Sequence, residues 1–363
     1  MARRRPSDLF DPVVDRGALN PSFISSLDQR YTPARLLLQR TFDRLPNPDG
    51  NFVRDFQTAG FDARVWELYL FAYGESAGFA VSRPDERPDY RFERNGPIWV
   101  EAVTAGPGPW PSSEPSALEM MADVLPIKLG SPLFSKIAKQ YWLLPHVAGQ
   151  PLVFALGDFH DPDPLRWPGD GVLLRYLYGL DAVVTSAPGA IVQVDRVLIG
   201  EHQYEKKAPI PSCFFAQPDS NRLSAVLFSN SGTLSKFNRM AYIANPDPNI
   251  RMIHYGVAYD DDPRALVPRP FAYVVGEEPE SWGEGLTVYY NPWATVPLAN
   301  DSFPDASAFG STTICANDCC LIIRCSLLLK SSVWVLPPRQ RQTDLLRRDL
   351  STPSSSFPKH SKK

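Results

Sequence analysis

The most restrictive feature of this sequence is a predicted helix, Asp62 to Ala77, that is apolar on almost every side. A helix with apolar residues all round is normally buried, so other elements must pack around it. The chain has 363 residues, 44% of them hydrophobic, which is enough for a sizeable core and predicts about two domains. The apolar residues of this helix are Val65, Trp66, Leu68, Tyr69, Leu70, Phe71 and Ala72.

The segments after this helix predict a layered α/β core. A second helix is predicted to begin at Ser131-Pro132 and to run to Trp142, because Ser is a good N-cap and Pro suits the first helical position. The order helix, strand, strand, strand, helix, strand is typical of an α/β arrangement. The four predicted strands are 79–81, 89–92, 98–103 and the continuous apolar run 151–156, which indicates a buried central strand.

Changes in amino-acid composition along the chain predict four parts. These are an N-terminal arm with one helix at most (1–50), an α/β core (51–180), a β-rich subdomain (181–310) and a Cys-containing basic tail (311–363). The tail differs so abruptly from the rest that we expect it to be disordered or divergent. The sequence does not predict an oligomeric state.

The charge balance limits the possible functions. A formal net charge of -3 excludes a protein that binds nucleic acid through bulk positive charge, but it leaves local basic sites open. The basic cluster MARRRP at the start is followed by no apolar region, so a secretory signal is not predicted. We therefore expect a cytoplasmic protein that has no membrane partner.

Three carboxylates are the most informative candidates for chemistry. Glu67 lies inside the apolar helix, where an ionised carboxylate is costly unless a cation or strong donors meet it. Asp89 opens one predicted strand, and Glu101 is the only charge in the next. Together they can converge on a hard divalent ion, Mg²⁺ or Mn²⁺, which activates a water for phosphodiester hydrolysis. The alternative is that Glu67 pairs with an arginine and that the strand carboxylates face solvent.

These residues resemble a known family. Pro88-Asp89, eleven intervening residues and Glu101-Ala102-Val103 resemble the motif of the PD-(D/E)xK nuclease superfamily over about residues 56–160. The segments GFDARVWELYL, VEAVT and KLGSPLFSKIAKQYWLLPHVAGQPLVFAL are similar to a group of uncharacterised bacterial proteins with that core. The resemblance implies a restriction-endonuclease-like αβββαβ core with a β-rich C-terminal extension, and a metal-dependent nuclease that acts on DNA.

One position departs from the family motif. The motif lysine, two residues after Glu101, is Val103 here, but some members supply the lysine from the following helix, where this chain has Lys136 and Lys139. With the apolar stripe of that helix facing the core, Lys136 and Gln140 share a flank, whereas Lys139 points away. We therefore expect Lys136 to stabilise the transition state, unless it is an ordinary snorkelling lysine. Lys139 and Gln140 are expected to contact nucleic acid.

Two functional hypotheses follow. In the first, the chain is a nuclease whose catalytic residues are Glu67, Asp89, Glu101 and Lys136, the three acids being the metal ligands. In the second, it is a catalytically inactive protein of the same fold that acts as a binding or assembly module, which Val103 favours.

A second basic group lies further along the chain. Lys236, Asn238 and Arg239 follow the turn sequence SNSGT at 229–233. This pattern predicts either a solvated loop or a contact to a nucleic-acid backbone.

Overall fold

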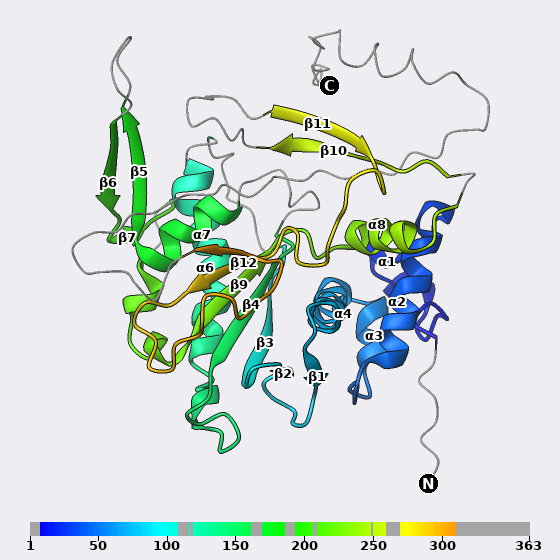
Figure 1. Ribbon diagram of the computed structural model, residues 1–363, viewed down its shortest axis with the longest axis horizontal. Helices are drawn as coiled ribbons and strands as arrows, with labels where there is room; N and C mark the ends of the chain where they lie inside the picture. The colour runs from blue at the N-terminus through cyan, green and yellow to red at the C-terminus, as the bar shows by residue number, and fades with distance from the viewer. Residues whose placement is uncertain are drawn as a thin grey trace.

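The chain forms a mixed α/β structure around one seven-stranded sheet (Figure 1). The computed structural model describes residues 8–107, 116, 119–160, 169–185, 193–205, 209–247, 250–258 and 269–309. The sheet contains, in spatial order, β1 (Ala80–Ser82), β2 (Tyr90–Glu93), β3 (Pro97–Ala105), β4 (Leu152–Asp158), β9 (Ala225–Ser229), β12 (Thr287–Tyr290) and β13 (Ser307–Phe309). The predicted tail, 311–363, lies outside the described residues.

The strands of the sheet run in both directions. Strands β1, β2 and β3 are antiparallel neighbours, whereas β3, β4 and β9 are parallel to one another. Beyond them β12 is antiparallel to β9 and parallel to β13. The predicted strands 89–92 and 98–103 are found as β2 and β3, which pair with each other.

Helices cover both faces of this sheet. The α-helices are α1 (Pro21–Ser26), α2 (Thr32–Arg44), α3 (Phe52–Gln57), α4 (Phe61–Ser76), α6 (Leu125–Ile137), α7 (Gly169–Tyr178) and α8 (Leu234–Ala244). Along β4, Val153 and Ala155 belong to the core beneath α4, whereas Phe154 and Leu156 belong to the core beneath α6 and α7. Both faces of β4 are therefore buried, which is why its sequence is apolar without alternation.

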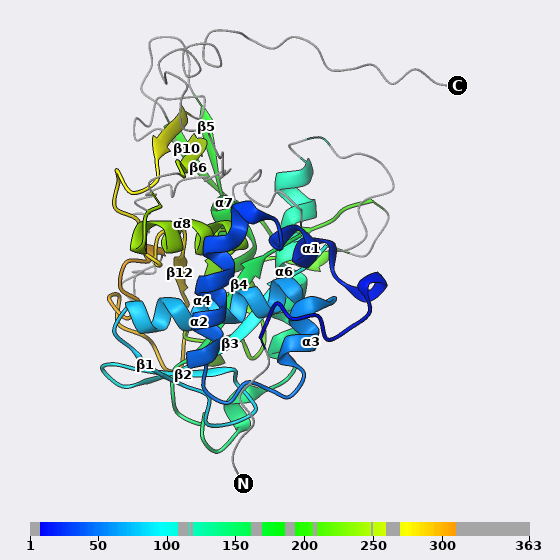
Figure 2. The same ribbon diagram turned by 90° about the vertical axis from the view of Figure 1, so that its right-hand side faces the viewer.

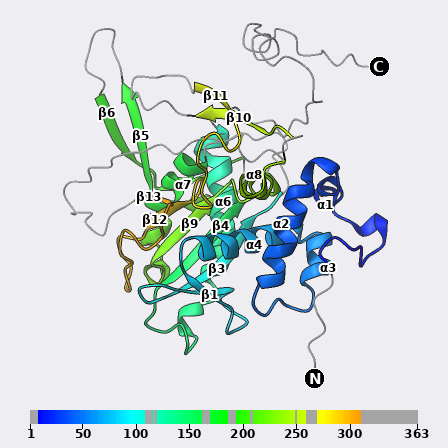
Figure 3. The same ribbon diagram turned by 45° about the vertical axis from the view of Figure 1, so that its right-hand side comes forward.

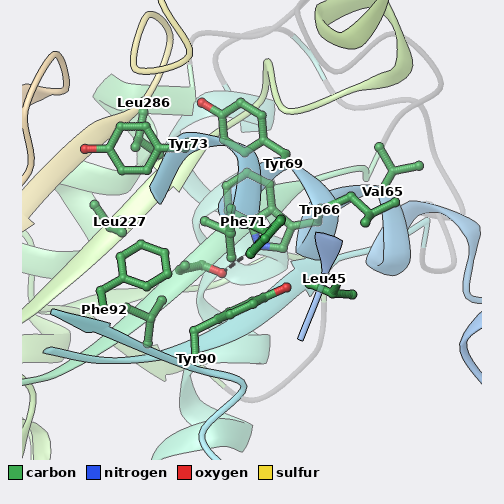
Figure 4. Close-up of a cluster of buried hydrophobic side chains, with 14 of the residues drawn as sticks. Leu45, Val65, Trp66, Tyr69, Phe71, Tyr73, Tyr90, Phe92, Leu227 and Leu286 are labelled. Carbon is green, nitrogen blue, oxygen red and sulfur yellow. Dashed lines mark hydrogen bonds between the residues drawn. The ribbon is translucent and has the colours of Figure 1, made fainter. Parts of the chain in front are cut away.

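Helix α4 confirms the predicted buried helix and packs closely on the sheet. The Trp66 indole N–H donates to the Ala155 carbonyl oxygen at 2.9 Å. A Cβ atom on Gly157 of β4 would lie 2.7 Å from the Trp66 ring, so the helix approaches the strand where the strand has no side chain. Figure 4 shows Trp66 in the same cluster as Tyr90 and Phe92 of β2.

The prediction of an N-terminal arm with one helix at most is wrong for the described part of residues 1–50. Two α-helices form there, α1 and α2, and α2 lies on the side of α4 that faces away from the sheet (Figures 2 and 3). Phe23, Leu38 and Phe42 are completely or almost completely buried in the core that α4 also enters. The short apolar segments of this region thus cover the side of α4 that faces away from the sheet.

Part of the predicted β-rich region, residues 181–310, extends the central sheet. Strands β9, β12 and β13 complete the central sheet, because the apolar run of β9 pairs in parallel with β4. Helix α8 follows β9 and contacts α2. Among the described residues, three small two-stranded sheets lie outside the central one, and the β5–β6 hairpin projects away from it (Figures 1 and 3). They are β5 (Leu180–Thr185) with β6 (Gln193–Leu198), β7 (Glu201–His202) with β8 (Ile210–Pro211), and β10 (Ile253–Ala258) with β11 (Arg269–Val274).

Helix lengths also bear on membrane insertion. Among the residues that the structure describes, no helix combines the length and the apolar character that crossing a bilayer requires.

Candidate functional site

The candidate residues lie where strand β3 extends beyond its pairing with strand β2. Strand β2 pairs with β3 only as far as Val100, whereas β3 continues beside β4 to Ala105. Within the described chain, this leaves the β2 side of residues 101–105 without a strand partner. A cavity of about 510 Å³ lies there, lined by residues of α4, α6 and β3 and by Asp89.

Asp89 is one of the residues that line this cavity. Tyr90 pairs with Val100, so continuing the antiparallel register by one step places Asp89 opposite Glu101. Asp89 Oδ2 accepts the backbone N–H of Ala102 at 2.8 Å. Burial, and next the charge of Glu101, raise the pKa of Asp89 to about 7.

Glu101 points toward helix α6, on the face of the sheet that this helix covers. Its side chain is 6% exposed and shares this face with Val103, which is buried in the core under α6. Glu101 Oε1 accepts the Tyr141 hydroxyl at 2.7 Å and contacts the Lys136 ammonium. These contacts supply the cation and the donor that a buried carboxylate needs.

Helix α6 differs from its prediction at both ends. It begins at Leu125 rather than at Ser131, and Pro132 lies inside it. Pro126 occupies the first turn, and the Ser131 hydroxyl bonds to the Ile127 carbonyl oxygen instead of capping a new helix. The Ser-Pro signal is therefore overridden by a start six residues earlier.

The end of α6 separates the three polar residues that follow its apolar stripe. The helix ends at Ile137, and Gln140 has a φ of +53°, so Gln140 does not share a helical flank with Lys136 as predicted. Lys139 is exposed and lines the cavity together with Lys136. Lys139 therefore borders the candidate site, whereas Gln140 is not among the residues that line the cavity.

Glu67 is held by two arginines. Its Oε1 lies 2.9 Å from Arg64 Nη1, and its Oε2 lies 3.1 Å from Arg83 Nη1. Arg64 also binds Asp49 at 2.7 Å and Asp55 at 2.6 Å. Burial raises the pKa of Glu67, and the guanidinium groups of Arg64 and Arg83 oppose that rise. The pairing of Glu67 with Arg64, considered from the sequence as the alternative to metal binding, is present.

Arg83 and Tyr141 also belong to the site, although their sequence positions do not predict it. Arg83 follows β1, and its Nη2 lies 3.7 Å from Asp89 Oδ1. Tyr141 lies in a 3₁₀ turn beyond α6. No periodic pattern surrounds Arg83, and Tyr141 fits an apolar stripe. Neither residue could therefore be predicted as part of the site from the sequence.

The carboxylates fit a divalent ion only in part. Within the described ranges, no group of three or more His, Cys, Asp and Glu side chains is arranged to hold a metal ion. Both oxygens of Glu67 are engaged by arginines, which argues against Glu67 as a direct ligand. Of the other two acids, Asp89 lines the cavity, whereas Glu101 does not line it and adjoins it through the contact with Lys136; a hard cation prefers such oxygens.

The group at 236–239 is neither a solvated loop nor exposed to a nucleic acid. It lies in α8, where Lys236 and Arg239 are buried and bind Glu280, Lys236 Nζ at 2.7 Å and Arg239 Nη2 at 2.8 Å. Asn238 Oδ1 accepts the N–H of Ala34 at the start of α2. These three side chains hold α8 against the rest of the molecule.

Comparison with known proteins found no match to this chain. No protein-family model matches this chain, and no curated protein or solved structure matches it either. The function of this chain is therefore inferred from the geometry of the site itself.

Proposed function

We propose that this chain is a divalent-metal-dependent nuclease that hydrolyses phosphodiester bonds of nucleic acid, with DNA as the first substrate to test. The observation that carries the proposal is the contact of Lys136 with Glu101, beside an Asp89 that the strand register places opposite Glu101. A lysine, a buried glutamate and an adjoining aspartate at the end of a cavity are the groups that such a reaction uses.

The order of elements supports the same proposal. Helix α4, strands β1, β2 and β3, helix α6 and strand β4 follow one another in the order that the restriction-endonuclease-like fold implies. We propose that this segment is such a core. The remaining strands of the central sheet would then be the C-terminal extension.

Asp89 and Glu101 are the residues that would hold Mg²⁺ or Mn²⁺. When bound, such an ion lowers the pKa of a water and offsets the charge on the leaving oxygen. Asp89 keeps its carboxylate oriented through the Ala102 N–H, and Tyr141 fixes Glu101. In this proposal Glu67 supports the site through its arginines rather than as a ligand.

Lys136 takes the role of the motif lysine. Val103, which occupies the usual position of that lysine, is buried in the apolar cluster beneath α6. Lys136 reaches Glu101 from the helix that covers the same face, and 32% of its side chain is exposed. Its ammonium group can therefore meet both the carboxylate and a phosphate in the cavity, while the exposed Lys139 would bind the phosphate backbone.

The experiment is a hydrolysis assay on the purified chain. Single-stranded DNA, double-stranded DNA and RNA are incubated with Mg²⁺ or Mn²⁺, and we expect cleavage of at least one of them. Asp89→Ala and Glu101→Ala should abolish cleavage, whereas Glu86→Ala, which changes an exposed acid in the loop before Asp89, should leave it intact. Cleavage that survives both site substitutions would refute the proposal.

A second function has one specific observation in its favour. The two arginines on Glu67 reduce the possible acidic ligands from three to two, and Val103 replaces the motif lysine. A catalytically inactive module that binds nucleic acid at the same cavity would show these features. Binding of DNA without hydrolysis under every metal condition would favour this second function.

A further inference from the structure

Arg83 connects Glu67 on helix α4 to Asp89, the acid just before strand β2. Its Nη1 lies 3.1 Å from Glu67 Oε2, and its Nη2 lies 3.7 Å from Asp89 Oδ1. One planar guanidinium group thus faces two carboxylates from two elements, an arrangement that a lysine cannot reproduce because it carries a single point charge.

The guanidinium group is fixed in place. The Arg83 side chain is only 10% exposed, and its guanidinium carbon lies 5.1 Å from the centre of the Tyr90 ring. Tyr90 in turn donates its hydroxyl proton to the backbone oxygen of Glu67 at 2.9 Å. Arg83 is therefore packed between the two acids and an aromatic face, and it has little freedom to leave Asp89.

We infer that Arg83 is a positioning residue that orients Asp89, and that the role of Glu67 is to hold Arg83. Asp89 Oδ2 is fixed by the Ala102 N–H, and Oδ1 faces Arg83 at a distance too long for a hydrogen bond. Oδ1 is thus attracted by the charge of Arg83, while its lone pairs stay available for a cation. Because Glu67 neutralises Arg83, the guanidinium places little net positive charge beside a divalent cation. The metal part of this inference rests on the proposed nuclease function.

The first test needs no metal. Hydrogen exchange of the Ala102 amide, measured by NMR on the full chain, reports whether Asp89 still accepts that proton. Arg83→Gln should accelerate this exchange, and Arg83→Lys should have an intermediate effect. Arg91→Gln, which removes a surface arginine paired with Glu93 on the same hairpin, is the matched control. Unchanged Ala102 exchange in a folded Arg83→Gln chain would overturn the inference.

The second test is a double-mutant cycle on Mn²⁺ affinity, measured by calorimetry. Arg83→Gln and Glu67→Gln should each weaken binding by roughly 10- to 100-fold, the range found when groups behind a metal ligand are lost. The double variant should be no weaker than the weaker single variant, because both changes remove the same orientation of Asp89. Losses that multiply would overturn the inference and make Glu67 an independent ligand.

The two tests separate the inference from the proposed function. A wild-type chain that neither binds Mn²⁺ nor cleaves any substrate would refute the nuclease proposal, yet the Ala102 exchange would still decide the role of Arg83. A wild-type chain that binds Mn²⁺ with an affinity unchanged by Arg83→Gln would overturn the inference alone. Thermal unfolding of each variant shows whether it is folded.

Discussion

Asp89 Oδ2 accepts the backbone N–H of Ala102 at 2.8 Å, so an aspartate side chain takes the place of a strand partner on the edge of β3. This contact satisfies a backbone donor at the point where β2 has ended. It also holds a mostly buried carboxylate opposite a second one on Glu101. The end of one strand thus creates the site and keeps two like charges together.

Lys136→Met should separate binding from catalysis at this site. The change removes the cation that contacts Glu101 and should lower the rate of cleavage by roughly 100- to 1000-fold if Lys136 stabilises the transition state. It should also cost about 1–3 kcal/mol of stability, because a buried acceptor loses a partner. Kinetic assays and urea unfolding measure the two effects. Lys139→Met, the control, should weaken DNA binding but leave the fold as stable as before.

Asp89→Asn should change how stability depends on pH. The folded pKa of Asp89, about 7, lies above the ordinary value of 3.8, so the folded state holds a proton that the unfolded state has released. Folding stability contributed by this group therefore falls as pH rises from about 4 to about 7. The variant lacks this loss, so its free energy of unfolding relative to the wild type should increase across that window. Parallel slopes in urea unfolding at pH 4 to 8 would contradict the prediction.

Metal addition should stabilise the wild-type chain more above pH 7 than below it. A metal ligand must be deprotonated, and the raised pKa of Asp89 delays its deprotonation. We expect the increase in melting temperature with Mn²⁺ to grow through this range and to disappear when the ion is removed with a chelator. A shift of equal size at pH 5 and pH 8 would argue against Asp89 as a ligand.

Gly157→Ala tests the close approach of α4 to the sheet. The added methyl group would lie 2.7 Å from the Trp66 ring, so either the helix or the ring must move. We expect a loss of about 1–3 kcal/mol in unfolding free energy, typical of overpacking. Gly50→Ala is the control, since nothing lies within 4 Å of that Cβ position.

Glu280→Gln should destabilise the contact of α8 with the loop that carries Glu280. Burial acts to raise the pKa of Glu280, but Arg239 and Lys236 overcome it and lower the pKa to about 2. The stabilising charge is present above about pH 4.5 and is lost as pH falls toward 2. At pH 7 the variant should lose about 3–5 kcal/mol, because two buried cations lose their acid. The exposed Glu278→Gln should be nearly neutral, and acid unfolding should narrow the difference between Glu280→Gln and the wild type.

Local pattern was enough to place several candidate groups. Glu101 is the only charge in an apolar run, and the strand predicted to open at Asp89 is found one residue later, because β2 begins at Tyr90 and pairs with β3. The apolar stripe after residue 131 turns Lys136 toward the sheet, and the structure brings it to Glu101. These positions depend on spacing within one or two elements, which the order of residues encodes directly.

Contacts between residues far apart in the sequence could not be predicted from local pattern. Arg83 is 16 residues from Glu67 and Glu280 is 41 from Arg239, and no local period links either pair. The central sheet includes strands from both sides of residue 180, which the sequence did not predict, because a strand does not record in its own sequence which sheet it will join. Strand β9 is apolar whether it starts a new sheet or extends the first one, and its pairing with β4 decides between them.

The sequence by itself determined that the helix at 61–76 is buried, that two acid-bearing strands follow it, and that a lysine-bearing helix comes next. Hydrophobic periodicity and turn chemistry act over a few residues, so they can be recognised from the sequence alone. Only the tertiary structure decided that Glu67 faces two arginines and that Arg83 meets Asp89. Which charges share a buried space depends on how distant segments pack, and that is settled by the whole chain at once.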